Sequence, residues 1–110
     1  MSSDPSVTWK DVEEAYARIK DHLHKTPIMT SKTLDQLVGC HVLFKCEHLQ
    51  KTGSFKPRGA LNNCIQLRDK GITSTVTHSS GNHGQAAAWA ASINGIKCIV
   101  VVPDGAPQTK

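Results

Sequence analysis

The sequence predicts an α/β fold organised around a parallel sheet. Residues 74–102 follow the order strand, helix, strand, which is the pattern of a crossover between two parallel strands. The second of these strands runs into the segment IVVVP at residues 99–103. A continuous β-branched run of this kind is typical of a strand that is buried on both faces of a parallel sheet.

The first expected element is a helix that begins after Thr8. Thr8 and Asp11 have the spacing of a capping box, in which each side chain bonds to the backbone N–H of the other residue. Thr26-Pro27 is expected to end this helix. Apolar residues recur at helical spacing and form its predicted buried stripe, namely Val12, Ala15, Tyr16, Ile19 and Leu23.

Two short elements are predicted next in the chain. A helix is expected from Lys32 to Val38, because Gly39 follows as a stop signal. Every second side chain of residues 41–47 is apolar, which predicts a strand. Residues 50–53 are expected to form a loop.

A third helix is expected to follow this loop. Ser54 is a suitable cap, Pro57 suits a first helical turn, and Gly71 follows the expected end of the helix. Its predicted buried face consists of Ala60, Leu61, Cys64, Ile65 and Leu67.

The crossover is predicted from the last part of the chain. Residues 74–78 are expected to form a strand and residues 79–82, with the sequence SSGN, a turn. An alanine-rich helix is expected from about residue 83 to residue 93, with Asn94-Gly95 as its stop. Since one crossover helix covers only one face of a sheet, we expect the chain to be the N-terminal part of a larger α/β enzyme.

The composition argues against several functional classes. Hydrophobic residues make up 38% of the 110 residues, which is ordinary for a soluble globular domain. The net charge of +4 is mildly basic, but lysine and arginine are scattered and never form a run of five. Aromatic residues make up only 5%, so platforms for base stacking are scarce and a nucleic-acid partner is not expected.

The cysteines and the N-terminal segment predict a cytoplasmic protein without a membrane partner. The N-terminal segment MSSDPSVTWKD has acidic residues and proline where a signal peptide would have basic and then apolar residues. No stretch approaches the roughly 20 apolar residues that span a bilayer. No CxxC or HExxH pattern is present, so no metal site is expected within the chain. The four cysteines are expected to be reduced thiols, namely Cys40, Cys46, Cys64 and Cys98.

Lys56, in the segment QKTGSFKPRGALNN, is the first candidate catalytic residue. An amine acts as a nucleophile only when it is neutral, and a helix N-terminus disfavours the ammonium form. Lys56 lies at such an N-terminus, with Arg58 two residues on. The local sequence leaves two interpretations open, an amine nucleophile and a solvated surface lysine, and the second is the commoner use of such a position.

The segment THSSGNHGQ, residues 77–85, is the second candidate. It lies between a predicted strand and a predicted helix, where open α/β sheets bind their ligands. Gly81 and Gly84 are expected to permit a positive φ and a close approach of the backbone to a ligand. The N–H groups at the start of the helix would then face an anion. The alternative is a plain turn that uses glycine and asparagine for its geometry.

These two segments together resemble the fold-type II pyridoxal-phosphate enzymes, and within them the serine racemase and serine/threonine dehydratase family. The resemblance rests on SFKPRGA and SSGNHGQ, and extends to KTPIMTS, LFKCEHLQKTGSFK, VTHSSGNHGQA and IVVVP. It covers nearly the whole chain from about Trp9. It implies the N-terminal portion of the fold-type II architecture, with residues 1–73 starting the large cofactor-binding domain and residues 74–110 starting the small α/β domain.

The resemblance implies a role for each matched residue. Lys56 would form the Schiff base with pyridoxal 5′-phosphate and move a proton on one face of the substrate Cα. Phe55 would lie beside the cofactor ring, and Asn82 would hydrogen-bond the 3′-oxygen of the cofactor. The substrate carboxylate would be contacted by Ser79, Asn82 and His83.

Ser80 is the residue that separates the activities within the family. Racemisation needs proton transfer on both faces of Cα, and Ser80 would supply the second group, opposite Lys56. Dehydratases that only eliminate water typically have SAGNHA where this chain has SSGNHG. The resemblance therefore implies interconversion of L- and D-serine, with side elimination of serine to pyruvate and ammonia.

The resemblance also implies activators and an assembly. ATP and a divalent cation, Mg²⁺ or Ca²⁺, would activate the full-length protein, which would be a homodimer acting on serine and also on threonine. In the family, the phosphate cradle and the metal ligands follow the part that matches this chain. The matching nucleotide positions are Glu13, Ser31, Lys32, Thr33, Lys51, Thr52 and Gln85.

Two alternatives stay open at this point. The first is a threonine or serine ammonia-lyase, which analysis of the products would separate from a racemase. The second is a non-catalytic fragment, which could pair with full-length subunits.

Overall fold

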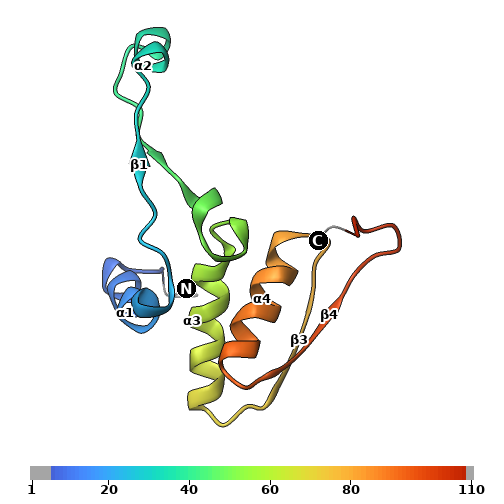
Figure 1. Cartoon of the computed structure of the whole chain (residues 1–110). Coiled ribbons are helices and arrows are strands. Elements are labelled where there is room, and N and C mark those ends of the chain that lie inside the picture. The colour runs from blue at the N-terminus through green and yellow to red at the C-terminus, as the bar shows by residue number, and fades with distance from the viewer. Residues whose placement is uncertain (1–5, 109–110) are drawn as a thin grey trace, which may run out of the picture.

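The computed structural model describes residues 6–108 (Figure 1). No helix among these residues is long and apolar enough to cross a bilayer. The elements in chain order are α1 (Trp9–Ile19), η1 (Lys20–His22), β1 (Ile28–Met29), α2 (Lys32–Val38), β2 (Phe44–Lys45), η2 (Glu47–Leu49), η3 (Lys51–Gly53), α3 (Lys56–Asp69), β3 (Ser74–His78), α4 (Asn82–Ile93) and β4 (Lys97–Val101).

The body of the molecule consists of α3, β3, α4 and β4. Strands β3 and β4 pair in parallel, from Ser74 opposite Lys97 to His78 opposite Val101, and α4 connects them. This confirms the predicted crossover. Helices α3 and α4 lie side by side and share one core (Figure 1). The most buried members of this core, each at most 3% exposed, are Leu61, Cys64, Ala86, Ala90 and Ala91.

Within the described residues β4 is covered on one face only, although its sequence is typical of a strand buried on both. Burial alternates along both strands, and only the face toward α4 is partly covered. On the opposite face Val76, Ile99 and Val101 remain more than half exposed, at 67%, 51% and 56%. A β-branched run therefore identified the strand correctly but did not show how many layers cover it.

Helix α3 follows its sequence signals closely. It begins at Lys56 after Phe55, and Gly71 follows with a positive φ of 73°. The expected buried face is confirmed, with Leu67 only partly buried. Ser54 is not the cap residue: its hydroxyl only accepts a long hydrogen bond of 3.4 Å from the Lys56 N–H.

A slender arm, residues 26–46, projects from the body and has α2 at its tip (Figure 1). Strands β1 and β2 pair in antiparallel fashion along its shaft. Helix α2 has its predicted bounds, because the Ser31 hydroxyl caps its start and Gly39 adopts a left-handed φ of 73°. The strand predicted over residues 41–47 is wrong except for its central pair, since β1 offers only two residues as a partner.

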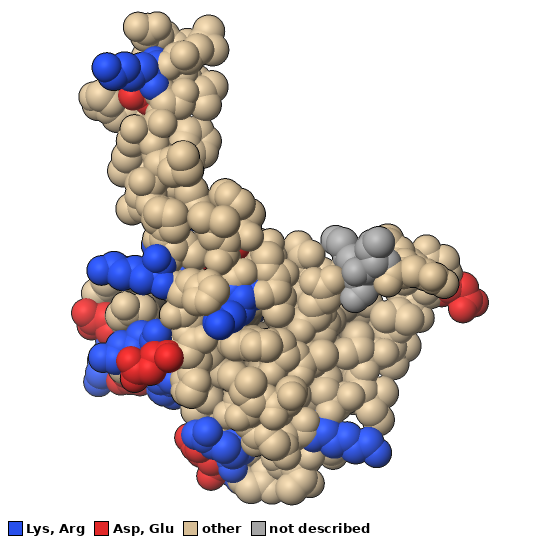
Figure 2. Space-filling model, viewed as in Figure 1, with Lys and Arg blue, Asp and Glu red and all other residues tan. Residues whose placement is uncertain are grey.

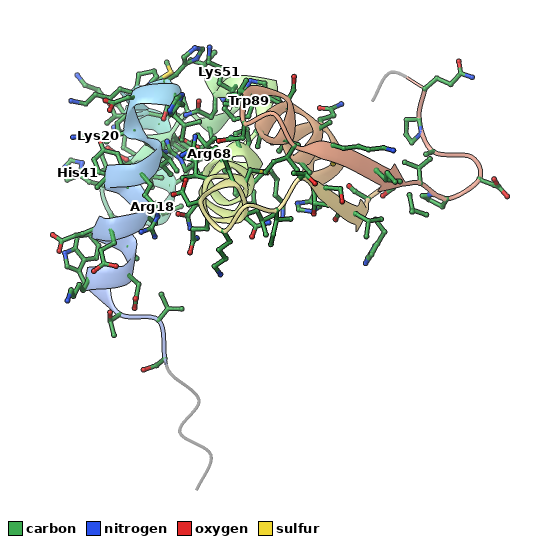
Figure 3. All side chains as sticks on the ribbon, turned by 90° about the horizontal axis from the view of Figure 1, so that it is seen from below. Arg18, Lys20, His41, Lys51, Arg68 and Trp89 are labelled. Atoms are coloured by element: carbon green, nitrogen blue, oxygen red, sulfur yellow. The ribbon has the colours of Figure 1, made fainter. Side chains whose placement is uncertain are left out.

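Helix α1 shows the predicted capping box but ends earlier than expected. Asp11 accepts from the Thr8 N–H at 2.7 Å, and its own N–H donates to the Thr8 hydroxyl at 3.3 Å. The helix stops at Ile19 and tightens into η1 before Thr26-Pro27. Of the predicted stripe only Ile19 is buried, because α1 contacts little besides α3 (Figure 3).

The molecule is extended for its mass. Its accessible surface is 8184 Å², whereas a compact protein of 11.9 kDa exposes about 5,900 Å². The radius of gyration is 17.1 Å, against about 13 Å for a compact domain of this length. Figure 2 shows charged side chains of both signs over α1 and few charges along the arm shaft. Large apolar side chains are among the exposed residues, including Val7, Trp9 and Leu37.

Candidate active site

Lys56 is the first residue of α3 and is half-buried. Its amine lies 5.1 Å from the centroid of the Phe55 ring, within the range of a cation–π contact. The ring itself is 60% exposed. The structure therefore places the Lys56 amine and the Phe55 ring, both named in the prediction, together at the N-terminus of α3.

A cavity of about 550 Å³ opens beside Lys56 and is bounded by α3, β3 and α4. Burial raises the pKa of the Cys64 thiol in its wall, so this thiol stays protonated. The cavity brings Phe55, Lys56 and His83 together. Its lining consists of Phe55, Lys56, Arg58, Gly59, Ala60, Asn63, Cys64, Thr75, Val76, Thr77, His83 and Ala87.

The turn between β3 and α4 uses its glycines differently from the prediction. Neither Gly81 nor Gly84 has a positive φ, so that expectation is wrong. A Cβ added to Gly84 would lie 3.0 Å from Val100 Cγ1 and 3.3 Å from Ser79 Cβ. Gly84 therefore lets the first turn of α4 approach β4 closely, and its need for glycine comes from packing within the protein.

The start of α4 carries the predicted anion-binding groups. No side chain caps this helix, and Asn82 and His83 are its first two residues. The His83 ring lies 3.0 Å from the Thr77 hydroxyl, which orients it from β3. The Ser79 hydroxyl accepts from the Gly81 N–H at 3.1 Å, which shapes the turn. Because a helix N-terminus favours negative charge, the start of α4 remains the candidate position for a carboxylate.

Ser80 lies in a different hollow from Lys56. A second cavity of about 380 Å³ contains Ser79, Ser80 and Gln85 together with residues of β4 and the C-terminal segment. The two cavities use different faces of the first turns of α4, one with His83 and the other with Gly84. The opposition of Lys56 and Ser80 across a substrate stays a prediction.

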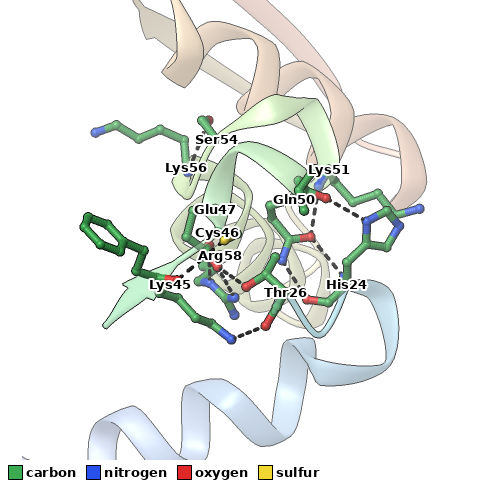
Figure 4. Close-up of polar contacts among 12 residues, drawn as sticks. His24, Thr26, Lys45, Cys46, Glu47, Gln50, Lys51, Ser54, Lys56 and Arg58 are labelled. Atoms are coloured by element: carbon green, nitrogen blue, oxygen red, sulfur yellow. Dashed lines mark hydrogen bonds and ion pairs between the residues drawn. The ribbon is translucent and has the colours of Figure 1, made fainter. Parts of the chain in front are cut away.

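The sequence reasoning missed Glu47, which is the partner of Arg58 (Figure 4). Arg58 donates from Nε to Oε2 and from Nη2 to Oε1 of this carboxylate, both at 2.7 Å. These bonds, helped by the Thr26 hydroxyl and the Arg58 and Lys45 charges, lower the pKa of Glu47 to about 2. Arg58 is thus a paired cation rather than a free charge beside Lys56. Nothing in the local pattern signals a contact across 11 positions of irregular chain.

Gln50 fixes the loop that leads to Lys56 (Figure 4). It is only 4% exposed, and its amide exchanges two hydrogen bonds with the His24 backbone, at 2.9 and 2.8 Å. Its oxygen also accepts from the Lys51 N–H at 2.9 Å. Thr52, which follows Lys51, has a φ of 59°, which is rare for a β-branched side chain.

The predicted nucleotide positions are not gathered into one place. Ser31, Lys32 and Thr33 lie at the tip of the arm, where Ser31 caps α2 (Figure 1). Glu13 lies on α1. Lys51 and Thr52 lie in η3, which contacts the helix that carries Gln85. The Thr52 hydroxyl is buried and has no hydrogen-bond partner.

The chain is similar to known proteins over nearly its whole length. A family model described as pyridoxal-phosphate dependent enzyme matches residues 19–110. A serine racemase of Dictyostelium discoideum is 51% identical over 111 residues, which cover 100% of this chain and 34% of that protein. A beta-hydroxyaspartate dehydratase of Paracoccus denitrificans (strain Pd 1222) is 46% identical over 104 residues, which cover 94% of this chain and 33% of that protein.

A solved structure of a pyridoxal-phosphate enzyme has the same fold over the matching part of its chain. The crystal structure of a pyridoxal 5′-phosphate-dependent aspartate racemase superposes with a TM-score of 0.88 and 52% sequence identity. The match covers 96% of this chain and 34% of that one. The chain thus spans about a third of the length of the curated relatives that it matches.

Proposed function

This chain belongs to the family of pyridoxal-phosphate-dependent enzymes, and we propose that it forms the N-terminal part of a serine racemase. The predicted fold class is confirmed, because the similarity to a solved enzyme of this kind extends over nearly the whole chain. The observation that carries the proposal is the Lys56 amine at the edge of a cavity, with Phe55 and His83 in the same lining.

The residues of this cavity fit the cofactor. A primary amine, an exposed aromatic ring and about 550 Å³ of space are what a small planar aldehyde would need. Lys56, Phe55 and Asn82 would hold the cofactor. When bound, pyridoxal phosphate withdraws electrons from the substrate Cα and so makes its proton removable.

The protein groups of the proposed site bind the substrate and move its proton. The uncapped start of α4, with Ser79, Asn82 and His83, would bind the carboxylate of serine, or of threonine as a second substrate. Lys56 would take or return the Cα proton on one face. Ser80 would serve the other face, which requires the substrate to lie between the two cavities at the N-terminal end of α4.

The remaining features of the proposal concern the longer protein. We propose that residues 1–73 and 74–110 begin a large and a small domain, that the full-length protein is a cytoplasmic homodimer, and that ATP with Mg²⁺ or Ca²⁺ activates it. The buried, unpartnered hydroxyl of Thr52 supports a polar ligand near η3. The described residues provide no group of three or more potential metal-ligating side chains, so the cation would need ligands from elsewhere.

The first experiment uses the full-length protein loaded with pyridoxal phosphate. The visible absorbance of the bound cofactor is expected in the wild type and should be absent from Lys56→Ala. Lys70→Ala is the matched control, because Lys70 is an exposed lysine at the far end of the same helix. A Lys56→Ala protein that keeps the band would refute the assignment of Lys56.

A dehydratase is the second candidate, and the Paracoccus relative favours it. Ser80→Ala should reduce formation of D-serine by at least tenfold while pyruvate formation falls much less, because only racemisation needs the second proton-transfer group. Chiral chromatography and an oxo-acid assay measure the two products. Equal losses would remove Ser80 from this role, and a wild type that forms only oxo acid would establish the dehydratase.

A further inference from the structure

The contact between Glu47 and Arg58 joins the base of the arm to α3, the helix that begins with Lys56. Glu47 begins η2, directly after the arm, and Arg58 is the third residue of α3. Their two parallel hydrogen bonds, both 2.7 Å long, form the bidentate geometry that fixes a guanidinium in orientation as well as position. Side-chain exposures of 19% and 32% shield this pair from much of the solvent.

Further bonds hold Glu47 in place from the arm side (Figure 4). The Thr26 hydroxyl donates to Glu47 Oε1 at 2.6 Å. Lys45 donates from Nζ to the Thr26 carbonyl at 2.7 Å. Glu47 therefore receives bonds from the start of the arm and from α3 at once, and it cannot move without disturbing both.

Arg58 and Lys56 line the same cavity, two residues apart in the first turn of α3. We infer that Glu47 is a positioning residue for Lys56, which fixes the first turn of α3 through Arg58 and neutralises the charge of Arg58 in the cavity lining that Arg58 shares with Lys56. This inference rests on the proposed role of Lys56. An unpaired Arg58 would disfavour the protonated amine, because like charges that line one cavity repel.

Several other titratable groups face this pair. Tyr16 from α1 and Lys45 from β2 interact with Arg58 and Glu47 respectively. Lys20, His24 and Lys25 line the same hollow as Glu47 and Arg58. Cys64 and His83 lie in the wall of the Lys56 cavity. Since Glu47 is the only carboxylate in the linings of these two hollows, its removal leaves their cations unbalanced.

The test measures the amine directly in the full-length protein freed of cofactor. Trace acetylation over a range of pH, read by peptide mass spectrometry, gives a titration midpoint for each lysine. In Glu47→Gln the midpoint of Lys56 is expected to fall by about 0.5 to 1 pH unit. The midpoints of the exposed Lys70 and Lys97 should stay unchanged and serve as internal controls. An unchanged Lys56 midpoint in Glu47→Gln would overturn the inference.

Two further variants separate charge from structure. The double variant Glu47→Gln, Arg58→Gln removes both charges, so the Lys56 midpoint should return to the wild-type value; a merely structural role predicts no return. Asp69→Asn, which breaks the exposed Arg68–Asp69 pair at the other end of α3, is the matched control and should change nothing.

Arg58→Lys covers the case in which Glu47→Gln does not fold. It keeps both charges but loses the bidentate geometry. Amide hydrogen exchange in the first turn of α3 should become several-fold faster, with the Lys56 midpoint unchanged. Unchanged exchange would overturn the positioning role, and a midpoint that falls as in Glu47→Gln would overturn the role of charge. Cofactor absorbance in the wild type and its loss in Lys56→Ala test the proposed function separately.

Discussion

The arm and the body of this molecule are held together by different kinds of interaction. In the body, α3 and α4 share a core in which Leu61, Ala86, Ala90 and Ala91 are completely buried. In the arm, Leu37, Val38 and Leu43 are 75%, 57% and 66% exposed, yet α2 still forms. The difference shows that caps and turns can define an element whose apolar side chains have no partner, whereas the body depends on packing.

The candidate active site lies where these two regions meet. Lys56 belongs to the body, but the loop and the carboxylate that fix its helical turn come from the chain that leaves the arm. Substitutions in the body should therefore reduce global stability, those in the arm should act locally, and those at the junction should do both.

The largest effect is expected from Leu61→Ala. Truncation of a completely buried leucine typically costs about 2 to 5 kcal/mol, a large part of the stability of a small protein. Leu37→Ala in the arm should change the free energy of unfolding by less than about 0.5 kcal/mol. Urea denaturation of the 110-residue chain, followed by circular dichroism, measures both. Equal losses would mean that the arm is also part of the cooperative unit.

The junction should respond to pH through Glu47. Its pKa is lowered from 4.5 to about 2 in the folded protein, so the unfolded state binds more protons between these values. The stabilisation is complete above about pH 4.5 and is lost as the pH falls toward 2. We expect wild type to lose about 2 kcal/mol more than Glu47→Gln between pH 6 and pH 2.5, because partial exposure reduces the full effect. If the free energy of unfolding fell equally with pH in the two proteins, the ion pair would not be the source of this stabilisation.

Gly84 in the body and Gly39 in the arm must be glycine for different reasons, so their substitutions should have different costs. Gly84→Ala should cost about 1 to 2 kcal/mol, because its Cβ would meet Val100 at 3.0 Å. Gly39 in the arm has no neighbour within 4 Å of an added Cβ, and only its φ of +73° requires glycine. Asparagine tolerates this conformation, so Gly39→Asn should be nearly neutral while Gly84→Asn should cost more than Gly84→Ala. Thermal unfolding compares these variants.

The most local effect is expected from Ser31→Ala at the cap of α2. Loss of such a cap costs about 1 kcal/mol, which is about fivefold in the local opening equilibrium. Hydrogen exchange should accelerate by that factor in α2 and remain unchanged around Leu61. Faster exchange in both regions would show that the arm and the body open together.

Features encoded by neighbouring residues were predictable from the sequence. The bounds of α2, the capping box at Thr8 and the end of α3 before Gly71 depend on side chains within four positions. The crossover was also predictable, because the period and the turn signals of residues 74–102 agree. The structure brings the candidate residues Phe55, Lys56 and His83 into one cavity, and their roles stay predictions.

Features that depend on a distant partner were not predictable. The strand predicted over residues 41–47 was too long because its length is set by β1, and the β-branched run of β4 does not say how many layers cover this strand within the chain. Glu47 was missed for the same reason, since its pairing with Arg58 depends on the path of the intervening loop. Gly84 was assigned to a ligand although Val100, a residue of another element, requires it.

The parallel register of β3 and β4 also constrains the order in which the chain folds. Pairing Ser74 with Lys97 closes a loop of 23 residues, which costs about 3 kcal/mol of chain entropy before any ladder bond forms. The α4 helix spans most of this loop, and its docking on α3 brings the two strand segments together. We therefore expect local helix formation to precede strand pairing, so that folding φ-values should be high at Leu61 and low at Val101.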